Sequence, residues 1–370
     1  MSSAQLSGGV VRTDLKMADG RAIRYYDLGE VNRSAVDQRE NEGRPKVGEL
    51  RLDLLTDEWI AMAPDRQTRA FLPPKELCPL CPTKPGLQSE IADSNYQVVV
   101  FDNKSPSLAA PSKEFSLPEN SGRNTPIVEA AGHCEVICYT DHHEGSFGEL
   151  PLSQIRMVME AWRDRVKELS KLPYVEHIFP FENRGEEVGV TLNHPHGQIY
   201  AYSFIPPRVE KMLTVATEHL KKNGTPLLTD IVARELKDEV RLVATNAHWI
   251  AYVPYAARYP FEIHIAPRKF VSDLAHLSED VADAFPEIAK EVLLRLDGVF
   301  GIEMAYIAAW YQSPVRVGRD ALGLHWQITS IRRAPGKLKY LAGSESAMGA
   351  FIMDMRPEQS ANQLREVKLK

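Results

Sequence analysis

The chain has 370 residues, of which 44% are hydrophobic and 25% are charged, a balance that is ordinary for a soluble globular protein. This length suits two domains, or two halves that share a sheet, and the net charge of −6 argues against a nucleic-acid partner. The opening residues contain no apolar run typical of a signal peptide, and no apolar run reaches membrane-spanning length, so we expect no membrane partner.

The first fifty residues predict a polar, irregular lead-in, whose extent we set at 1–48. Two short strands are expected next, at 49–53 and 59–63, with a turn between them. Arg66 and Arg69 follow on a loop, where two arginines are either solvated or face a phosphate.

A Cys-x-x-Cys pair, Cys78 and Cys81, comes next in a proline-bearing turn. This spacing is typical of zinc or redox sites, and the redox interpretation needs a helix directly after the pair, which the sequence does not predict. Zinc is therefore favoured, and it requires two further ligands from elsewhere in the chain. Because there are four cysteines in all, the chain suits a reduced compartment, and we predict a cytoplasmic protein.

Strands and one helix follow in turn. We expect strands at 97–101, 134–139 and 174–179, a loop at 104–126 and a turn at 182–185. Apolar residues recur at three and four positions from Leu152 to Leu169, which predicts an amphipathic helix over 151–171. His142 and His143 lie just after the second of these strands, and they are a plausible source of a third zinc ligand.

The segment 193–200, with the sequence NHPHGQIY, is the strongest functional candidate. In extended backbone alternate residues project to one face, so His194, His196 and Gln198 would share a side. Pro195 cannot donate to a strand ladder, which puts the segment at a strand start or a sheet edge. Polar side chains of this kind are unusual in a hydrophobic core, so we predict a functional site here. The histidine pair also supplies the fourth candidate zinc ligand.

The second half of the chain repeats this order of elements. Residues 262–265 match 135–138 (262 − 135 = 127), and His325 matches His196 (325 − 196 = 129). A helix near 278–296 and a strand at 305–310 lie between these matches. The near-constant offset indicates an internal duplication.

The second copy has lost the histidine pair, because Gly323 stands where the first copy has His194. We therefore predict one active centre per chain. Helices are expected between the two copies. The resulting division is a lead-in at 1–48, a first half with the catalytic and zinc motifs at 49–207, connecting helices at 208–246 and a degenerate second half at 247–370.

With these residues the sequence resembles the galactose-1-phosphate uridylyltransferases, the transferase branch of the histidine-triad superfamily. The resemblance runs from about residue 49 to near residue 355 and is carried by LCPLC at 77–81, FENRG at 181–185, HPHGQ at 194–198 and HWQ at 325–327. It implies an α+β protein with a duplicated histidine-triad fold, in which antiparallel sheets carry helices on one side, assembled as a homodimer. It also implies transfer of UMP from UDP-glucose to galactose 1-phosphate in the Leloir pathway of galactose metabolism.

By this resemblance His196 is the nucleophile of a ping-pong mechanism with a covalent uridylyl-histidine, and Gln198 donates its amide to the phosphate oxygens. An imidazole suits the first role because its neutral form is available near pH 7. Lys104 departs from the family, which usually has an acid at that position. The resemblance assigns further substrate contacts to Arg66, Arg69, Asn103, Asn183, Thr191, Lys339 and Glu345.

The resemblance also implies one structural zinc ion, held by Cys78, Cys81, His143 and His194. His143 fits the family frame better than His142, by one residue. Some members hold a second metal through a His-x-His after the HWQ stretch and another histidine upstream of it. Here Thr329 and Ile331 occupy the places of that His-x-His, and 315–324 contains no histidine, so we expect no second metal.

Two other functions compete with uridylyl transfer. Related enzymes of the superfamily use adenylyl donors such as ADP-glucose or dinucleoside polyphosphates, and a serine in place of Gly197 would have favoured them. A non-catalytic zinc module that binds nucleotides or nucleic acid is the other alternative. The acidic charge balance and the His-Pro-His stretch argue against that module.

Overall fold

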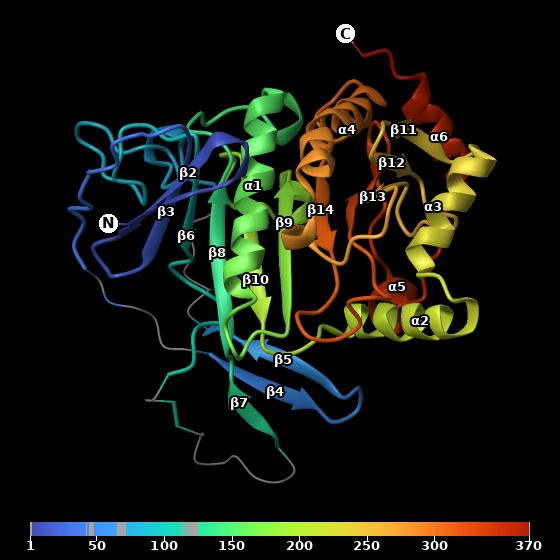
Figure 1. Ribbon diagram of the computed structural model, residues 1–370, viewed down its shortest axis with the longest axis horizontal. Helices are drawn as coiled ribbons and strands as arrows, with labels where there is room; N and C mark the ends of the chain where they lie inside the picture. Colours follow the sequence, from blue (N-terminus) through green and yellow to red (C-terminus); the bar gives the residue numbers. More distant parts are fainter. Residues whose placement is uncertain are drawn as a thin grey trace.

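The fold centres on a large antiparallel sheet (Figure 1). The computed structural model describes residues 2–41, 43, 48–64, 72–112, 115–116 and 125–369. Twelve strands of the described chain pair in the order β1-β2-β3-β6-β8-β10-β9-β14-β15-β13-β12-β11. They are β1 (Ser2–Gln5), β2 (Val10–Lys16), β3 (Ala22–Leu28), β6 (Val98–Asp102), β8 (Gly132–Cys138), β9 (His177–Arg184), β10 (His196–Tyr202), β11 (Leu242–Thr245), β12 (Trp249–Tyr252), β13 (Phe261–Pro267), β14 (Tyr306–Tyr311) and β15 (His325–Ser330).

Two long helices, α1 (Leu152–Leu169) and α4 (Glu279–Gly298), pack against each other over one face of this sheet (Figure 1). Trp162 of α1 and Phe285 of α4 both contact Trp310 of β14, with ring centroids 5.9 and 5.1 Å apart. The expected α+β fold with an antiparallel sheet is confirmed. The other helices are α2 (Pro207–Asn223), α3 (Leu227–Asp238), α5 (Gly343–Met348) and α6 (Pro357–Glu366).

Helix α3 covers the opposite face of the sheet at its far edge. Val232 of α3 packs with Ile250 of β12, whereas the neighbouring Trp249 contacts Phe285 of α4 on the other side. The connecting segment 208–246 is helical as expected except at its end, which forms β11. No helix in the described ranges is long and apolar enough to cross a membrane.

Smaller β-structure lies beside the large sheet. The strands predicted at 49–53 and 59–63 are confirmed, as β4 (Glu49–Asp53) and β5 (Glu58–Met62). They form a second sheet in the order β5-β4-β7, with β7 spanning Ile127–Glu129. A hairpin near the C-terminal end pairs β16 (Arg332–Ala334) with β17 (Lys337–Leu338).

A pseudo-twofold axis relates the two halves and passes between β9 and β14. Phe181 of β9 pairs with Gln198 of β10, and Ala309 of β14 pairs with Gln327 of β15. Phe181 and Ala309, which thus hold equivalent positions, also pair directly with each other. The strand order is mirrored on either side of this pair. The two halves of the duplication therefore form one continuous sheet, joined by the pairing of β9 with β14.

The ladder register corrects one detail of the predicted repeat. Val136 pairs with Gln198 in the first half and His264 pairs with Gln327 in the second, so these strands differ by 128 positions (264 − 136 = 128). The predicted equivalence of Glu135 with Glu262 is therefore wrong by one residue. Since side chains alternate along a strand, the two glutamates point to opposite faces of the sheet.

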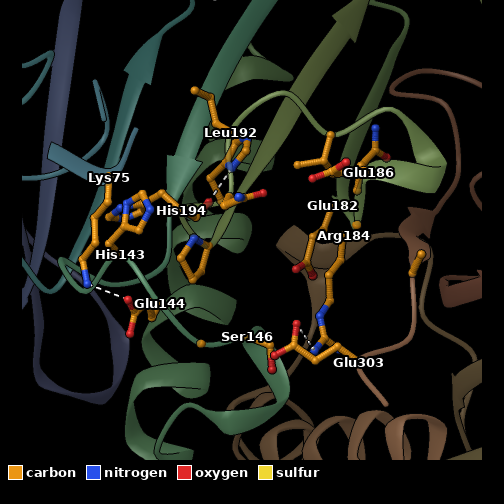
Figure 2. Close-up of a pocket in the computed structure, with 18 of the residues that line it drawn as sticks. Lys75, His143, Glu144, Ser146, Glu182, Arg184, Glu186, Leu192, His194 and Glu303 are labelled. Carbon is orange, nitrogen blue, oxygen red and sulfur yellow. Dashed lines mark hydrogen bonds and ion pairs between the residues drawn. The ribbon is translucent and has the colours of Figure 1, made fainter. Parts of the chain in front are cut away.

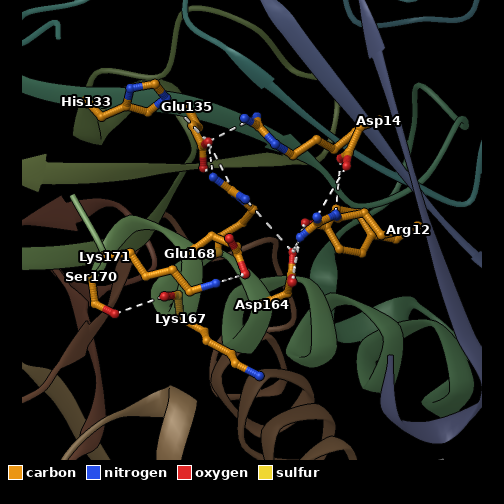
Figure 3. A network of polar contacts seen from close by, with 12 residues as sticks. Arg12, Asp14, His133, Glu135, Asp164, Lys167, Glu168, Ser170 and Lys171 are labelled. Carbon is orange, nitrogen blue, oxygen red and sulfur yellow. Dashed lines mark hydrogen bonds and ion pairs between the residues drawn. The ribbon is translucent and has the colours of Figure 1, made fainter. Parts of the chain in front are cut away.

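The prediction of an irregular first fifty residues is wrong, because three strands of the large sheet lie there. Ion pairs with distant residues anchor them (Figure 3). Arg12 of β2 donates two hydrogen bonds to Asp164 of α1 at 2.8 and 2.9 Å, and Tyr26 of β3 donates to the same carboxylate at 2.7 Å. The segment was predicted to be irregular because it is polar, and its polar side chains Arg12 and Tyr26 are bound by Asp164, more than a hundred residues away in the sequence.

A neighbouring cluster joins Asp102, His133 and Glu135, whose ligand atoms lie within 4.8 Å of one another. Arg165 of α1 contacts the Glu135 carboxylate at 2.8 Å and Arg24 of β3 contacts it at 3.2 Å. These arginines hold the pKa of Glu135 well below its usual range although the residue is buried. The carboxylate is already neutralised, so we interpret the cluster as a structural ion-pair network and not as a cation site.

The turn predicted at 182–185 is also wrong, because β9 extends to Arg184. Its last residues pair with β14 across the pseudo-twofold axis, Asn183 with Ile307 and Arg184 with Tyr306. The polar residues Glu182, Asn183 and Arg184 thus belong to a central strand. This strand end lies next to the start of β10.

Candidate active site

The segment 193–200 joins the large sheet at His196, which is the first residue of β10. Half-buried His196 and Gln198 alternate with buried Gly197 and Ile199, so they share the sheet face opposite to helix α1. His194 precedes the strand and is 1% exposed. The row predicted for three side chains therefore contains two of them, and His194 lies apart from it.

The protonation of the His196 ring is fixed by its own backbone neighbourhood. Nδ1 of His196 lies 2.7 Å from the carbonyl oxygen of His194, and a carbonyl only accepts hydrogen bonds. Nδ1 must therefore carry the proton, which leaves the lone pair on Nε2. Burial lowers the pKa of His196, which favours this neutral form.

The four predicted metal ligands come together from three parts of the chain. One ligand atom each of Cys78, Cys81, His143 and His194 lies within 4.8 Å of the others. Sγ of Cys81 is 3.4 Å from Nδ1 of His143 and 3.5 Å from Nδ1 of His194. A tetrahedral zinc ion with its usual bond lengths separates a sulfur and a nitrogen ligand by about 3.5 Å, so the donor set fits zinc.

The other nitrogen of His194 supports this arrangement. Its Nε2 lies 2.8 Å from the carbonyl oxygen of Thr140 and 2.8 Å from the hydroxyl of Tyr96, which itself donates to the Leu80 carbonyl. Nε2 therefore carries the proton and leaves Nδ1 available as a ligand atom, the usual outer-shell arrangement of a metal-bound histidine. His142, the alternative ligand, is 84% exposed and contacts Asp141 at 3.0 Å instead.

A cleft of about 840 Å³ opens beside His196 (Figure 2). It extends from His143 and His194 to the end of β9 and the loop after α4, where Glu182 and Glu303 line it. Lys75 and Glu144 form an exposed ion pair of 2.6 Å at its rim. The cleft is large enough for a nucleotide-sized ligand.

Of the predicted substrate contacts that the structure describes, Asn183 lines the cleft, whereas Gln198, Thr191 and Asn103 are not among the lining residues. Thr191 lies in the loop that leads to His194, where its carbonyl accepts from Leu72. Asn103 follows β6, and its side chain accepts from the Ser105 backbone at 2.9 Å.

Two further predicted contacts, Lys339 and Glu345, are not brought to this cleft. Lys339 and Glu345 are buried and contact each other at 3.1 Å, and neither is among the described residues that line it. Arg66 and Arg69 lie outside the described residues.

Comparison with known proteins identifies the family. The family model for the galactose-1-phosphate uridyl transferase N-terminal domain matches residues 39–206, and that for the C-terminal domain matches 213–370. The chain belongs to the galactose-1-phosphate uridylyltransferase family. This is a family of enzymes, the UDP-glucose—hexose-1-phosphate uridylyltransferases, which act in galactose metabolism.

Individual relatives agree with this assignment. A galactose-1-phosphate uridylyltransferase of Streptomyces lividans is 40% identical and covers 96% of this chain and 98% of the relative; one of Thermotoga maritima is 35% identical and covers 87% and 99%. A solved structure described as a uridylyltransferase superposes with a TM-score of 0.77 at 32% identity, covering 86% of this chain and 98% of that one. An Arabidopsis thaliana ADP-glucose phosphorylase, 24% identical with a TM-score of 0.67, shares the fold.

The second half of the chain has the same strand arrangement but different side-chain contacts at the positions equivalent to His196 and Gln198. Gln327, the counterpart of Gln198, donates to Glu262 at 2.9 Å and accepts from Arg208 at 3.1 Å. His325, the counterpart of His196, is stacked under Tyr311 with ring centroids 5.3 Å apart. Both ends of the Gln327 amide are thus engaged by the protein, in accord with a single active centre.

The sequence did not single out Glu182, although the structure places it in the cleft beside His196. It belongs to the FENRG stretch, but a glutamate in a turn is ordinarily solvated, and the turn was the expected structure there. Its burial follows from the extension of β9, which sequence periodicity did not indicate.

Proposed function

We propose that the chain transfers UMP from UDP-glucose to galactose 1-phosphate by a ping-pong mechanism through a uridylyl group on His196. Family membership supports the reaction. The observation that carries the mechanism is the 2.7 Å hydrogen bond from Nδ1 of His196 to the His194 carbonyl, because it leaves Nε2 as the free nucleophilic atom.

The two half-reactions balance without a proton donor. Nε2 of His196 attacks the α-phosphorus of UDP-glucose, the N–P bond forms, and the bond from that phosphorus to the bridging oxygen breaks to release glucose 1-phosphate. A phosphate oxygen of galactose 1-phosphate then attacks the same phosphorus, and the N–P bond breaks to give UDP-galactose. Glucose 1-phosphate departs as an anion in the first step, and the neutral imidazole of His196, still protonated at Nδ1, departs in the second.

The remaining predicted residues would hold the nucleotide and the sugar. Gln198 shares the strand face of His196 and would donate its amide to the phosphate oxygens, where charge builds up in the transition state. Sequence resemblance supports the other assignments. These are Asn103, Asn183 and Thr191 for the nucleotide, Arg66 and Arg69 for phosphates, and Lys339 and Glu345 for the hexose.

We also propose one structural zinc ion at Cys78, Cys81, His143 and His194, and no second metal. The distances among these residues and the tautomer of His194 fit such an ion. A bound zinc ion would cross-link the cysteine turn, the loop after β8 and the start of β10. His194 would then be held from its side chain while its carbonyl orients His196.

The assembly and location belong to the same proposal. Exposed apolar residues around α5, with Tyr340 at 76%, Met348 at 78% and Ile352 at 60%, support a homodimer that covers them. The four cysteines are free thiols, which supports a reduced, cytoplasmic location. We expect UDP-glucose and galactose 1-phosphate as the partners, without nucleic acid.

The decisive experiment is intact-mass analysis after the wild-type chain is mixed with UDP-glucose alone. We expect a covalent UMP adduct that disappears when galactose 1-phosphate is added and that does not form with His196→Ala. ADP-glucose is the parallel donor, and an adduct from ADP-glucose only would replace the proposed function by the adenylyl alternative. An adduct that persists in His196→Ala would contradict the assignment of His196 as the nucleophile. No adduct from either donor would contradict the mechanism and favour the non-catalytic module.

The matched control is His325→Ala, which removes the counterpart of His196 in the second half. This histidine is 5% exposed and stacked under Tyr311, so it should not accept UMP. The adduct should form in this variant as in the wild type. Folding of both variants can be compared by their melting temperatures.

A further inference from the structure

Glu182 is a buried carboxyl group that lines the same cleft as His196 without a role in the proposed chemistry. It is 5% exposed, and Figure 2 shows its side chain extending from β9 into the region between His194 and Arg184. Its Oε1 accepts a hydrogen bond from the Tyr306 hydroxyl at 3.2 Å. Its Oε2 is buried and has no hydrogen-bond partner among the described residues.

An ionised Glu182 would be costly at this position. A carboxylate is an acceptor with two oxygens to satisfy, and here one of them has no donor among the residues that the structure describes. The nearby cation, Arg184, is already bound to both oxygens of Asp297 at 2.8 and 2.9 Å and lies 3.9 Å from Glu303. Arg184 therefore forms its ion pairs with Asp297 and Glu303, and the protonated form of Glu182 is favoured.

The surroundings of Glu182 are otherwise neutral or negative. Burial raises the pKa of Glu182, Arg184 and the Tyr306 hydrogen bond oppose this shift, and Asp297 adds to it, so that the resulting pKa is about 8. The Tyr139 hydroxyl is a second buried group without a partner among the described residues, and its pKa is raised by burial and by Glu182. The charged or titratable groups facing Glu182 from the packed elements are Tyr139 after β8, Arg184 of β9, His196 of β10, Asp297 of α4, Glu303 after α4 and Tyr306 of β14.

We propose that Glu182 is a positioning residue that must stay uncharged for the cleft to bind phosphorylated substrates. A neutral carboxyl fixed by Tyr306 holds the end of β9, and with it Asn183, beside the nucleophile strand. A negative charge at Glu182 would repel the phosphate groups in the cleft and would draw water or a cation into the core. This inference rests on the proposed function of the cleft.

The first test is the pH dependence of kcat/KM for UDP-glucose and for galactose 1-phosphate. In the wild type a neutral Glu182 with a pKa near 8 predicts a loss of about tenfold from pH 7 to pH 9. In Glu182→Gln, which cannot ionise, the ratio of the pH 9 value to the pH 7 value should approach one. The matched control is Glu303→Gln, a side chain of the same cleft that is 85% exposed, and it should keep the wild-type ratio.

An equal loss in Glu182→Gln and in the wild type would overturn the inference, as would disappearance of the loss in Glu303→Gln. If the wild type forms no adduct and does not turn over at pH 7, the proposed function fails and a second measurement decides on Glu182. This measurement is the infrared carbonyl band of a protonated carboxyl in the wild-type chain, which needs neither turnover nor a folded variant.

We expect that band at pH 7 and its loss with a midpoint near pH 8. Absence of the band at pH 7 would refute the uncharged state. Melting temperatures at several pH values test the direction in which the stability changes with pH. Because the folded-state pKa lies above the usual value of 4.5, wild-type stability should fall between pH 4.5 and 8 relative to Glu182→Gln. A difference that is constant over this range would also refute the proposal.

Discussion

The carbonyl oxygen of His194 accepts the Nδ1 hydrogen bond of His196 at 2.7 Å, while Nδ1 of His194 lies 3.5 Å from the sulfur of Cys81. One residue thus links a site suited to a metal ion with the ring that is suited to attack phosphorus. The link runs through backbone and side chain of the same residue, so it transmits position and not charge. It explains why two histidines that are two residues apart have different environments, one buried and one facing the cleft.

This link predicts that loss of zinc and loss of adduct formation go together. His194→Ala and Cys81→Ser should reduce the zinc content per chain, measured by atomic emission after dialysis, and should lower the melting temperature. They should also slow formation of the UMP adduct, because the start of β10 is no longer held. His142→Ala is the control, because His142 is 84% exposed, and it should keep both zinc and activity. Zinc bound at wild-type content in Cys81→Ser would contradict the ligand set.

The pair Gln198 and Gln327 predicts an asymmetry between the two halves. Gln198→Ala should lower kcat by roughly 10²- to 10³-fold, the usual cost of one donor to developing charge, with a smaller change in KM. Gln327→Ala removes a side chain that is bound to Glu262 and Arg208, so its cost should appear in the melting temperature. Steady-state kinetics of both variants would separate these effects. Similar losses of kcat in both would argue for a role of the second half in catalysis.

Much of this fold could be predicted from local patterns. Helix α1 and the strands β8 and β10 have apolar residues at regular spacing, and their burial follows from that spacing. The candidate zinc ligands could be proposed from the sequence because a Cys-x-x-Cys pair without a following helix favours a metal site over a redox site. The family resemblance favoured His143 over His142 as a ligand, and in the structure Nδ1 of His143 lies 3.4 Å from the sulfur of Cys81.

The missed features depend on contacts between distant residues. The strands β2 and β3 contain Arg12 and Arg24, which are satisfied by carboxylates on α1 and β8, and no local periodicity shows these ion pairs. Glu182 is similar, because the FENRG stretch indicates a polar turn unless the pairing of β9 with β14 is known. Whether a charged residue is buried depends on the residues that form ion pairs or hydrogen bonds with it, and these distant partners cannot be read from the sequence pattern.

Gly197 is predicted to be intolerant of any side chain. A Cβ at this position would overlap the Tyr139 hydroxyl and lie 2.7 Å from the Phe181 carbonyl oxygen. We expect Gly197→Ala to reduce stability by about 1–3 kcal/mol, the usual cost of overpacking, and to displace His196. Tyr139→Phe removes a hydroxyl that has no partner among the described residues, so the double variant should recover part of the loss in melting temperature. A Gly197→Ala chain with wild-type stability and kinetics would contradict the close approach.

His177 predicts a pH-dependent loss of stability that is independent of the active site. It is fully buried at the start of β9, and neither ring nitrogen has a hydrogen-bond partner among the described residues. Burial lowers the pKa of His177 to about 4, so the folded chain binds this proton less readily than the unfolded chain, whose value is near 6.5.

The contribution of a neutral His177 is therefore complete above pH 6.5 and is lost as the pH falls to 4. The difference between a pKa of about 4 in the folded chain and about 6.5 in the unfolded chain corresponds to about 3 kcal/mol of stability at the acid end. His177→Phe keeps a flat ring of similar size without a titratable nitrogen. Its free energy of unfolding relative to that of the wild type should therefore rise by this amount as the pH falls from 6.5 to 4. Urea unfolding at several pH values measures the difference, with His142→Phe as the exposed control that should give no pH-dependent change. A constant difference between His177→Phe and the wild type would show that the buried ring does not resist protonation.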